Sequence, residues 1–160
     1  MTRPRLLDLF CGAGGCSVGY HRAGFDVTGV DIEPHEDYPF EFIQADAMDL
    51  LADTALLDTF DVVHASPPCP RYSVATPTNA RDDHPDLLQP TLDALTAWGG
   101  AWVVENVPGA HMPHPITICG RSMGLRYTRR HRLFSSTAPL MAPGCACGTE
   151  SPYGVTGDSP

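Results

Sequence analysis

Residues 65–73, with the sequence ASPPCPRYS, contain the thiol whose setting best suits covalent chemistry. They follow a short apolar run at residues 60–63, which predicts a buried strand. Pro67 and Pro68 end that strand and stiffen the backbone, because each fixes φ and removes a hydrogen-bond donor. Cys69 is therefore expected at the carboxyl end of a strand, where open α/β sheets bind ligands. Two interpretations follow, a catalytic nucleophile and a small buried side chain.

The amino-terminal residues predict elements that would hold a cofactor beside this cysteine. Residues 6–10 predict a strand, residues 11–15 a glycine-rich turn, and residues 16–23 a helix. A second strand at residues 26–30 ends at Asp31, about 20 residues after the turn, where an acid can accept from ribose hydroxyls. Glycines let the backbone approach a ligand, and a helix N-terminus offers N–H groups. The pattern favours a nucleoside-bearing cofactor, although G-x-G-G is not the dinucleotide fingerprint.

A third acid follows a third predicted strand. Residues 42–45 predict this strand, Asp46 ends it, and residues 48–57 predict a helix. Asp46 could accept a hydrogen bond from the exocyclic amine of an adenine, or it could cap the helix that follows. The neighbouring residues do not separate these two roles.

The second half of the chain predicts one more carboxylate at a strand end. Residues 74–85 predict an exposed loop, and a helix follows to about Trp98. Residues 102–104 predict a strand, after which comes Glu105. A carboxylate directly after a buried strand is costly unless it has a partner, so Glu105 is a candidate functional acid as well as a possible surface residue.

The region after residue 110 predicts less regular structure. Weak strands are expected at residues 116–119 and 125–127, and a strand at residues 129–134 would present Arg130 and Arg132 on one side. Beyond Phe134, proline and glycine recur and no element is predicted.

Two groups of metal-binding residue types carry no metal prediction. His111 and His114 lie in a proline-rich loop without further ligands at zinc spacing. Cys145 and Cys147 form a single C-x-C, which without matched ligands indicates bystanders. We therefore expect no metal site.

Composition narrows the functional classes. The chain has 160 residues and a formal charge of −9, which argues against non-specific nucleic-acid binding. It has no lysine, and half of its ten arginines crowd one segment. These are Arg121, Arg126, Arg129, Arg130 and Arg132. No segment resembles a secretion signal or membrane span, so six reduced cysteines and a cytoplasmic location are expected.

Taken together, these segments resemble the motifs of the DNA (cytosine-5) methyltransferases. The matching segments, in family order and spacing across roughly residues 6 to 134, are 8–15, 29–32, 45–47, 67–69, 105–107 and 130–134. The resemblance implies an α/β, Rossmann-like S-adenosylmethionine-dependent methyltransferase fold, with a mostly parallel sheet and helices on both faces. The segment near Cys119 and the compact spacing look most like small phage enzymes, and the family includes restriction-modification enzymes.

The resemblance also implies roles for individual residues. Cys69 would be the nucleophile, Glu105 would bind the N3 and amino edge of cytosine, and Arg130 and Arg132 would hold its O2 side. S-adenosylmethionine would be bound by Phe10, Gly12, Gly14, Asp31, Ile32, Asp46, Ala47 and Pro67. The partner would be double-stranded DNA with the target cytosine flipped out, under a lid formed by residues 74–85.

The chain departs from the family pattern at three places. Pro70 and Thr128 stand where the family has glutamine, and no recognition region or late motif follows Phe134. We therefore expect residues 1–134 to form the catalytic domain and residues 135–160 to be an irregular tail that begins a C-terminal region. A complementary subunit could supply the rest of that region. Two alternatives stay open: methylation of tRNA, and a non-catalytic or split subunit.

Overall fold

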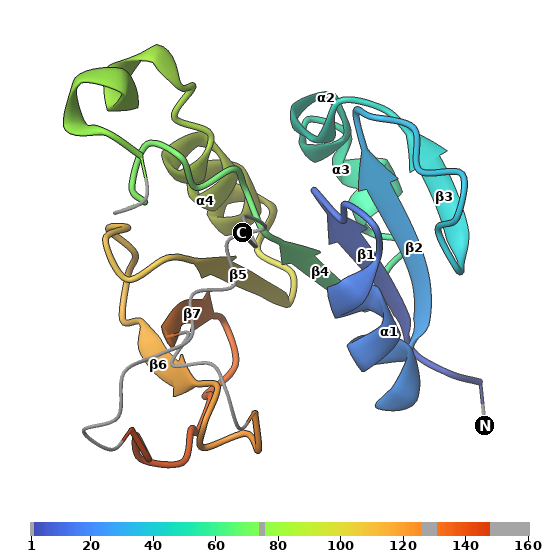
Figure 1. Cartoon of the computed structure of the whole chain (residues 1–160). Coiled ribbons are helices and arrows are strands. Elements are labelled where there is room, and N and C mark those ends of the chain that lie inside the picture. Colours follow the sequence, from blue (N-terminus) through green and yellow to red (C-terminus); the bar gives the residue numbers. More distant parts are fainter. Residues whose placement is uncertain (1, 74–75, 126–130, 148–160) are drawn as a thin grey trace.

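A computed structural model of the protein describes residues 2–73, 76–125 and 131–147. Its centre is a sheet in which seven strands of the described residues have the order β3-β2-β1-β4-β5-β7-β6 (Figure 1). The strands are β1 (Arg5–Leu9), β2 (Asp26–Asp31), β3 (Glu41–Gln44), β4 (Val62–Ala65), β5 (Trp102–Asn106), β6 (Ile116–Cys119) and β7 (His131–Ser136). The helices are α1 (Gly15–Arg22), α2 (Ala47–Leu51), α3 (Thr54–Leu57) and α4 (Leu88–Trp98), with a 3₁₀ helix at Thr78–Asp83.

The sheet is mostly parallel. The neighbours β3, β2, β1, β4 and β5 run parallel, while β7 is antiparallel to both β5 and β6. Helix α1 lies on one face and α2, α3 and α4 lie on the other (Figure 1). The predicted fold class is confirmed.

The two faces of the sheet are chemically different, because neighbouring residues of a strand point to opposite sides. Leu7, Leu9 and Val63 belong to the apolar core, which includes residues of α2, α3 and α4. The face toward α1 instead buries Asp8 and His64, which pair in register between β1 and β4. The core therefore holds the sheet on one side, and a polar network lies on the other.

Two predicted elements in the first half of the chain have other boundaries in the structure. Strand β4 runs to Ala65 rather than ending at Val63, because His64 is buried as a partner of Asp8. The predicted helix over residues 48–57 is two helices, since Asp53 accepts from the Leu56 N–H at 3.0 Å and starts a new one.

The far edge of the sheet also differs from the prediction. β7 continues to Ser136, because Ser135 and Ser136 pair with Val104 and Val103. Leu125 closes a turn by donating its N–H to the Gly120 carbonyl at 2.9 Å, so a strand does not begin there. The rest of that predicted strand, like Arg130 and residues 148–160, lies outside the described residues.

Candidate active site

The glycine-rich turn after β1 shapes one wall of the site. Phe10, Gly12 and Gly14 all have positive φ, at 59°, 51° and 84°. Gly14 starts helix α1, and a Cβ there would lie 2.9 Å from the ring of Tyr38, so a larger residue does not fit without movement. Gly12 is therefore needed for its positive φ, and Gly14 is needed because a Cβ has no space there.

Asp31 at the end of β2 is held by the same turn. Its carboxylate accepts from the Gly12 N–H at 2.9 Å and from the Glu33 N–H at 3.1 Å. His35 Nε2 lies 3.8 Å from its Oδ2. These contacts fix the direction of the carboxylate beside the turn, as a site that accepts hydroxyl donors requires.

A cavity of about 240 Å³ opens next to Asp31. Its lining is Phe10, Asp31, Ile32, Asp46, Ala47, Pro68 and Leu87. Five of the eight residues predicted for the cofactor are therefore brought together. Pro68 and Leu87 were missed, and Leu87 had no signal because it precedes α4, far along the chain from the glycine turn.

The remaining predicted cofactor residues do not line this cavity. Gly12 supports it by positioning Asp31, and Gly14 starts α1. Pro67 is buried, and its carbonyl oxygen accepts a hydrogen bond from Asn106 Nδ2 at 3.0 Å. Pro67 therefore helps to hold the Cys69 turn in place and does not line the cavity.

Asp46 performs the capping role and also borders the cavity. Its Oδ1 accepts from the Met48 N–H at 2.8 Å, which satisfies one exposed donor of α2. The two roles that the sequence could not separate are therefore compatible.

The turn that carries half-buried Cys69 is tied down on two sides. Within the turn, the Cys69 carbonyl accepts from the N–H groups of Tyr72 and Ser73, each at 2.9 Å. From outside, Asn106 binds the turn at Pro67, and a Cβ at Gly109 would lie 2.5 Å from the Tyr72 carbonyl oxygen. The segment after β5 therefore packs directly on the cysteine turn.

Glu105 and Arg132 meet across strands β5 and β7. Glu105 pairs in register with Phe134, so Arg132, two residues before Phe134, lies diagonally opposite on the same face. Arg132 Nε is 3.2 Å from Glu105 Oε1. Yet Glu105 Oε1 is buried and has no well-aligned hydrogen-bond donor among the described residues. The hydrogen-bonding capacity of this oxygen is therefore not fully used by the described residues, although the charged guanidinium lies beside it.

The segment predicted as a lid is anchored to the cysteine turn by Arg71. Its guanidinium lies 3.3 Å from Asp82 and 3.8 Å from Asp86. Between residues 76 and 86 the chain forms a 3₁₀ helix rather than an open loop. The role of this segment as a lid stays a prediction.

A buried polar network that sequence reasoning missed lies beneath α1. Asp8 Oδ1 is 2.8 Å from His64 Nδ1, Ser17 donates to the other Asp8 oxygen, and Tyr38 donates to Ser17 at 2.7 Å. Burial opposes protonation of His64, but its hydrogen bonds to Asp8 and Cys16 outweigh burial and raise its pKa to about 10. Asp8 within an apolar strand was the available signal.

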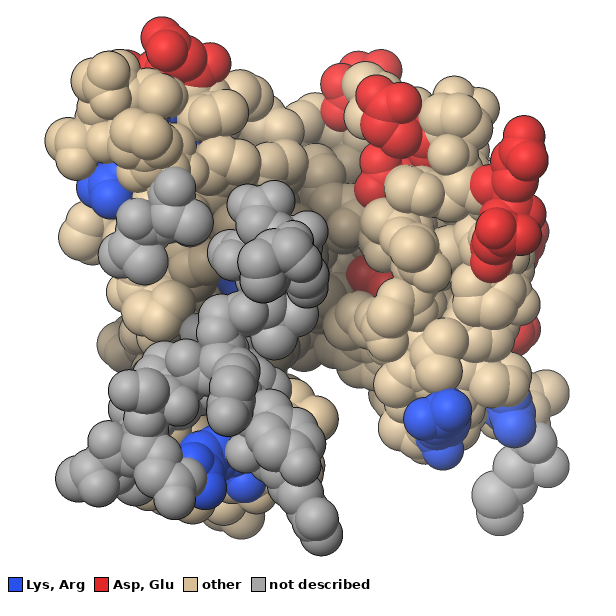
Figure 2. Space-filling model, in the orientation of Figure 1, with Lys and Arg blue, Asp and Glu red and all other residues tan. Residues whose placement is uncertain are grey.

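The surface distributes charge unevenly. Figure 2 shows acidic side chains over the part of the molecule around α2 and β2, whereas most basic side chains in that view lie at the opposite end. A furrow separates the half that carries β1, β2 and β3 from the half that carries α4, β5, β6 and β7.

Among the described residues, no helix has both the length and the apolar composition that crossing a membrane requires.

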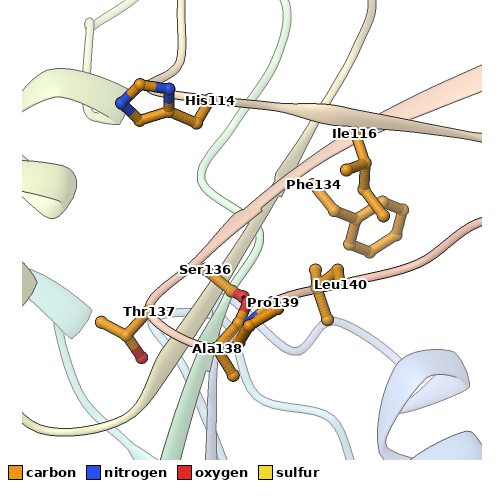
Figure 3. A pocket seen from close by; sticks show the side chains of 8 residues that line it. All are labelled: His114, Ile116, Phe134, Ser136, Thr137, Ala138, Pro139 and Leu140. Atoms are coloured by element: carbon orange, nitrogen blue, oxygen red, sulfur yellow. Dashed lines mark hydrogen bonds between the residues drawn. The ribbon is translucent and has the colours of Figure 1, made fainter.

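A second cavity of about 330 Å³ lies along β6 and β7 (Figure 3). Its lining is His114, Ile116, Phe134, Ser136, Thr137, Ala138, Pro139 and Leu140. Ser136 pairs with Val103, three residues before Asn106, so the cavity extends away from the end of β5 that contacts the cysteine turn. It shares no lining residue with the cavity beside Asp31, although Phe134 pairs in register with Glu105.

Three cysteines form a cluster that the sequence did not predict. Cys119 Sγ lies 3.4 Å from Cys147 Sγ and 3.7 Å from Cys145 Sγ. The Ser122 N–H binds the Cys119 sulfur and lowers its pKa to about 5. The expectation that Cys145 and Cys147 have no matched ligand overlooked Cys119, which is 26 residues before Cys145 and so beyond any local motif.

Comparison with known proteins identifies the family. The sequence model of the C-5 cytosine-specific DNA methylases matches residues 4–114. The chain belongs to this family. The matched range contains the glycine turn, Cys69 and Glu105, and ends before Arg132.

Two curated DNA methylase relatives match over shorter stretches. The type II methyltransferase M.XorII of Xanthomonas oryzae pv. oryzae is 63% identical over 35 residues, 21% of this chain and 8% of that protein. The type II methyltransferase M1.HphI of Haemophilus parahaemolyticus is 38% identical over 81 residues, 43% of this chain and 22% of that protein. The chain thus spans less than a quarter of the length of either relative.

Solved methyltransferase structures share the fold. A DNMT2 mutant from Spodoptera frugiperda has a TM-score of 0.60 and 16% identity, covering 94% of this chain and 57% of its own. The Entamoeba histolytica methyltransferase EhMeth has a TM-score of 0.57 and 14% identity, covering 96% and 58%. At this identity the likeness concerns architecture alone.

Proposed function

We propose that this chain transfers a methyl group from S-adenosylmethionine to carbon 5 of cytosine in DNA, through a covalent adduct with Cys69. The observation that carries the proposal is the link between Asn106 and Pro67. This hydrogen bond fastens the cysteine turn to strand β5. The residue before Asn106 on that strand is Glu105, whose buried Oε1 has no well-aligned hydrogen-bond donor among the described residues. Membership of the family supports the same chemistry.

The cavity beside Asp31 fits the nucleoside part of the cofactor. Phe10, Ile32 and Leu87 give it apolar walls that suit an adenine ring. Asp31 would accept from the ribose hydroxyls and Asp46 from the adenine amine. When bound there, S-adenosylmethionine supplies an electrophilic methyl group.

The residues of the chain would act in sequence on the cytosine. The Cys69 thiolate adds to carbon 6, which makes carbon 5 enamine-like and able to attack the methyl carbon, so that the methyl–sulfur bond breaks and S-adenosylhomocysteine is the leaving group. Glu105 hydrogen-bonds the N3 and amino edge and stabilises the charge that develops on the ring. Arg132, with Arg130 from outside the described residues, holds the O2 side. Loss of the carbon 5 proton and elimination of the thiolate release the methylated base.

DNA requires more than this chemistry, because carbon 6 of a stacked cytosine is not accessible to the thiol. The base must leave the duplex, and the segment after the cysteine turn would close over it. Residues 1–134, extended by β7 to Ser136, would be the catalytic domain. A further region or a separate subunit would recognise the target sequence. The protein would act in the cytoplasm of a bacterial or phage-infected cell.

Trapping of the adduct tests the proposal. The protein is incubated with S-adenosylmethionine and duplex DNA containing 5-fluorocytosine, which blocks release after methyl transfer. We expect a covalent protein–DNA species that Cys69→Ser abolishes, with turnover on ordinary DNA falling about 10⁴-fold or more. Cys16→Ser, which removes an exposed thiol outside the site, should leave the adduct unchanged.

Two comparisons decide between the alternatives. Labelled tRNA in place of DNA asks whether RNA is the better substrate, and preference for tRNA would overturn the assignment to DNA. Addition of a C-terminal half from a family member asks whether this chain needs a partner. Failure to form an adduct with and without that half would exclude catalysis by this chain.

A further inference from the structure

Three sulfur atoms meet where the end of the edge strand β6 contacts the segment after β7. All pairwise separations among the Sγ atoms of Cys119, Cys145 and Cys147 lie within 4.8 Å. Two of them are 3.4 and 3.7 Å, much longer than the ~2.05 Å of a disulfide bond. A tetrahedral zinc ion with Zn–S bonds of ~2.3 Å separates its sulfur ligands by about 3.8 Å. The observed spacing is thus that of thiolate ligands around one ion.

The backbone around the cluster is held in place by a single hydroxyl group. Ser122 Oγ donates to the Gly144 carbonyl at 2.5 Å and accepts from the Ala146 N–H at 3.0 Å. This fastens the turn after Cys119 to the C-x-C segment, although the two are more than twenty residues apart in the sequence. Such outer contacts orient the ligands of metal sites.

A second group of possible ligands is less suited to a metal ion. Asp8, Cys16 and His64 also place one donor atom each within 4.8 Å of the others. In that group, however, Asp8 is already occupied by His64 at 2.8 Å and by Ser17. A cation would have to displace a buried ion pair, which is costly.

We propose that Cys119, Cys145 and Cys147 bind one zinc ion, which fastens the segment after β7 to the edge of the sheet. Thiolates are soft ligands, and together with tetrahedral spacing they select zinc over magnesium or calcium. The three sulfurs leave one tetrahedral position, which a water molecule can fill. The site has no part in the chemistry proposed for Cys69, so either proposal can fail without the other.

Metal content of the purified protein tests the site. Full-length protein is purified without chelator or added metal, and zinc is measured by mass spectrometry against protein concentration. We expect about one zinc ion per chain. Each of Cys119→Ser, Cys145→Ser and Cys147→Ser should lower the zinc content by about tenfold or more, because a site with three protein ligands depends on each. Cys16→Ser and Cys69→Ser should retain it.

A second measurement on the wild-type protein covers the case in which the serine variants do not fold. Chelator-treated protein is titrated with Co(II), and uptake by the cluster should produce thiolate-to-cobalt charge-transfer bands that one equivalent of zinc removes. Zinc that is retained in the three cluster variants and lost in Cys16→Ser would assign the ion to the other group. Neither zinc nor cobalt uptake, or a disulfide within the cluster in non-reduced protein, would overturn the proposal.

Discussion

Two carboxylates, Asp8 and Glu105, each face a basic side chain on a nearby strand, and their surroundings differ. Asp8 and His64 are 0% and 1% exposed, and Ser17 satisfies the second oxygen of Asp8. Glu105 and Arg132 have side chains that are 18% and 34% exposed, and Glu105 Oε1 makes no well-aligned hydrogen bond to the described residues. A closed pair contributes to the fold, whereas a partly exposed pair with an incompletely hydrogen-bonded oxygen suits contact with a substrate. The difference is consistent with the proposal that Asp8 serves stability and Glu105 serves chemistry.

Removal of Asp8 should have the largest effect on stability. Asp8→Ala leaves the buried His64 without its partner, and breaking a buried pair costs about 3–5 kcal/mol. Urea denaturation followed by circular dichroism measures the free energy of unfolding. Asp37→Ala, which removes an exposed carboxylate outside this network, is the matched control. A loss below about 1 kcal/mol in Asp8→Ala would mean that the closed pair does not hold the fold.

Glu105→Gln should show the opposite pattern. Because the proposed role of this acid is to bind the substrate, turnover should fall about 10²–10³-fold. Since the pair is partly exposed, the free energy of unfolding should change by less than about 1 kcal/mol. Methyl transfer to DNA, cofactor affinity by calorimetry and urea denaturation are measured together. Equal losses of cofactor affinity and turnover would make Glu105 a structural residue.

Asn106 connects the Glu105 strand to the cysteine turn, so its removal sharpens the comparison. Asn106→Ala deprives the buried Pro67 carbonyl of its donor, and we expect a loss of about 1–3 kcal/mol of stability. The turn should also become mobile, so the rate of adduct formation with 5-fluorocytosine DNA should fall while cofactor affinity is retained. Unchanged adduct formation would show that the turn is positioned by other contacts.

The closed pair also predicts a dependence of stability on pH. The folded-state pKa of His64 is raised to about 10, above its unfolded value of about 6.5. The stabilisation is therefore fully present below about pH 6.5 and is lost as pH rises through about 10, at roughly 1 kcal/mol per pH unit. Urea denaturation between pH 6 and 10 measures this slope. The slope should be shallower in Asp8→Ala, and an equal slope in both proteins would exclude the pair as its cause.

The smallest effect is expected at Asp46, where capping and cofactor binding can be separated. Asp46→Ala should cost about 1 kcal/mol, because the Met48 N–H loses its acceptor. Asp46→Asn retains a capping oxygen and should restore stability, while cofactor affinity falls if the carboxylate binds the adenine amine. Thermal denaturation and calorimetry give the two values, and equal affinity in both variants and the wild type would leave Asp46 only its cap.

The sequence predicted the parallel part of the sheet well because local patterns determine it. Alternating apolar runs, a glycine turn and strand-end acids lie close together in the first 69 residues, and five predicted cofactor residues line one cavity. The role of Asn106, the polar network at Asp8 and the cysteine cluster were missed. Each depends on contacts between residues more than twenty positions apart, which periodicity does not reveal.

The predicted element boundaries were wrong where a polar side chain forms a hydrogen bond that the sequence does not reveal. The predicted strand covered only the apolar run at residues 60–63, but the pairing of His64 with Asp8 lets β4 continue through His64. Likewise, Asp53 inside an apolar stretch gave no sign of a break, although its side chain starts α3. Both errors have the same cause, a side chain whose hydrogen-bond partner is unknown before folding.

The order of the strands has a consequence for solubility during folding. The sheet ends in β3 and β6, which are four residues each. Pro113 and Pro115 precede β6, and proline has no N–H to donate to an added strand. Short edges with prolines beside them give another molecule few backbone groups to pair with. The short length of both edge strands, and the prolines beside β6, therefore disfavour edge-to-edge aggregation.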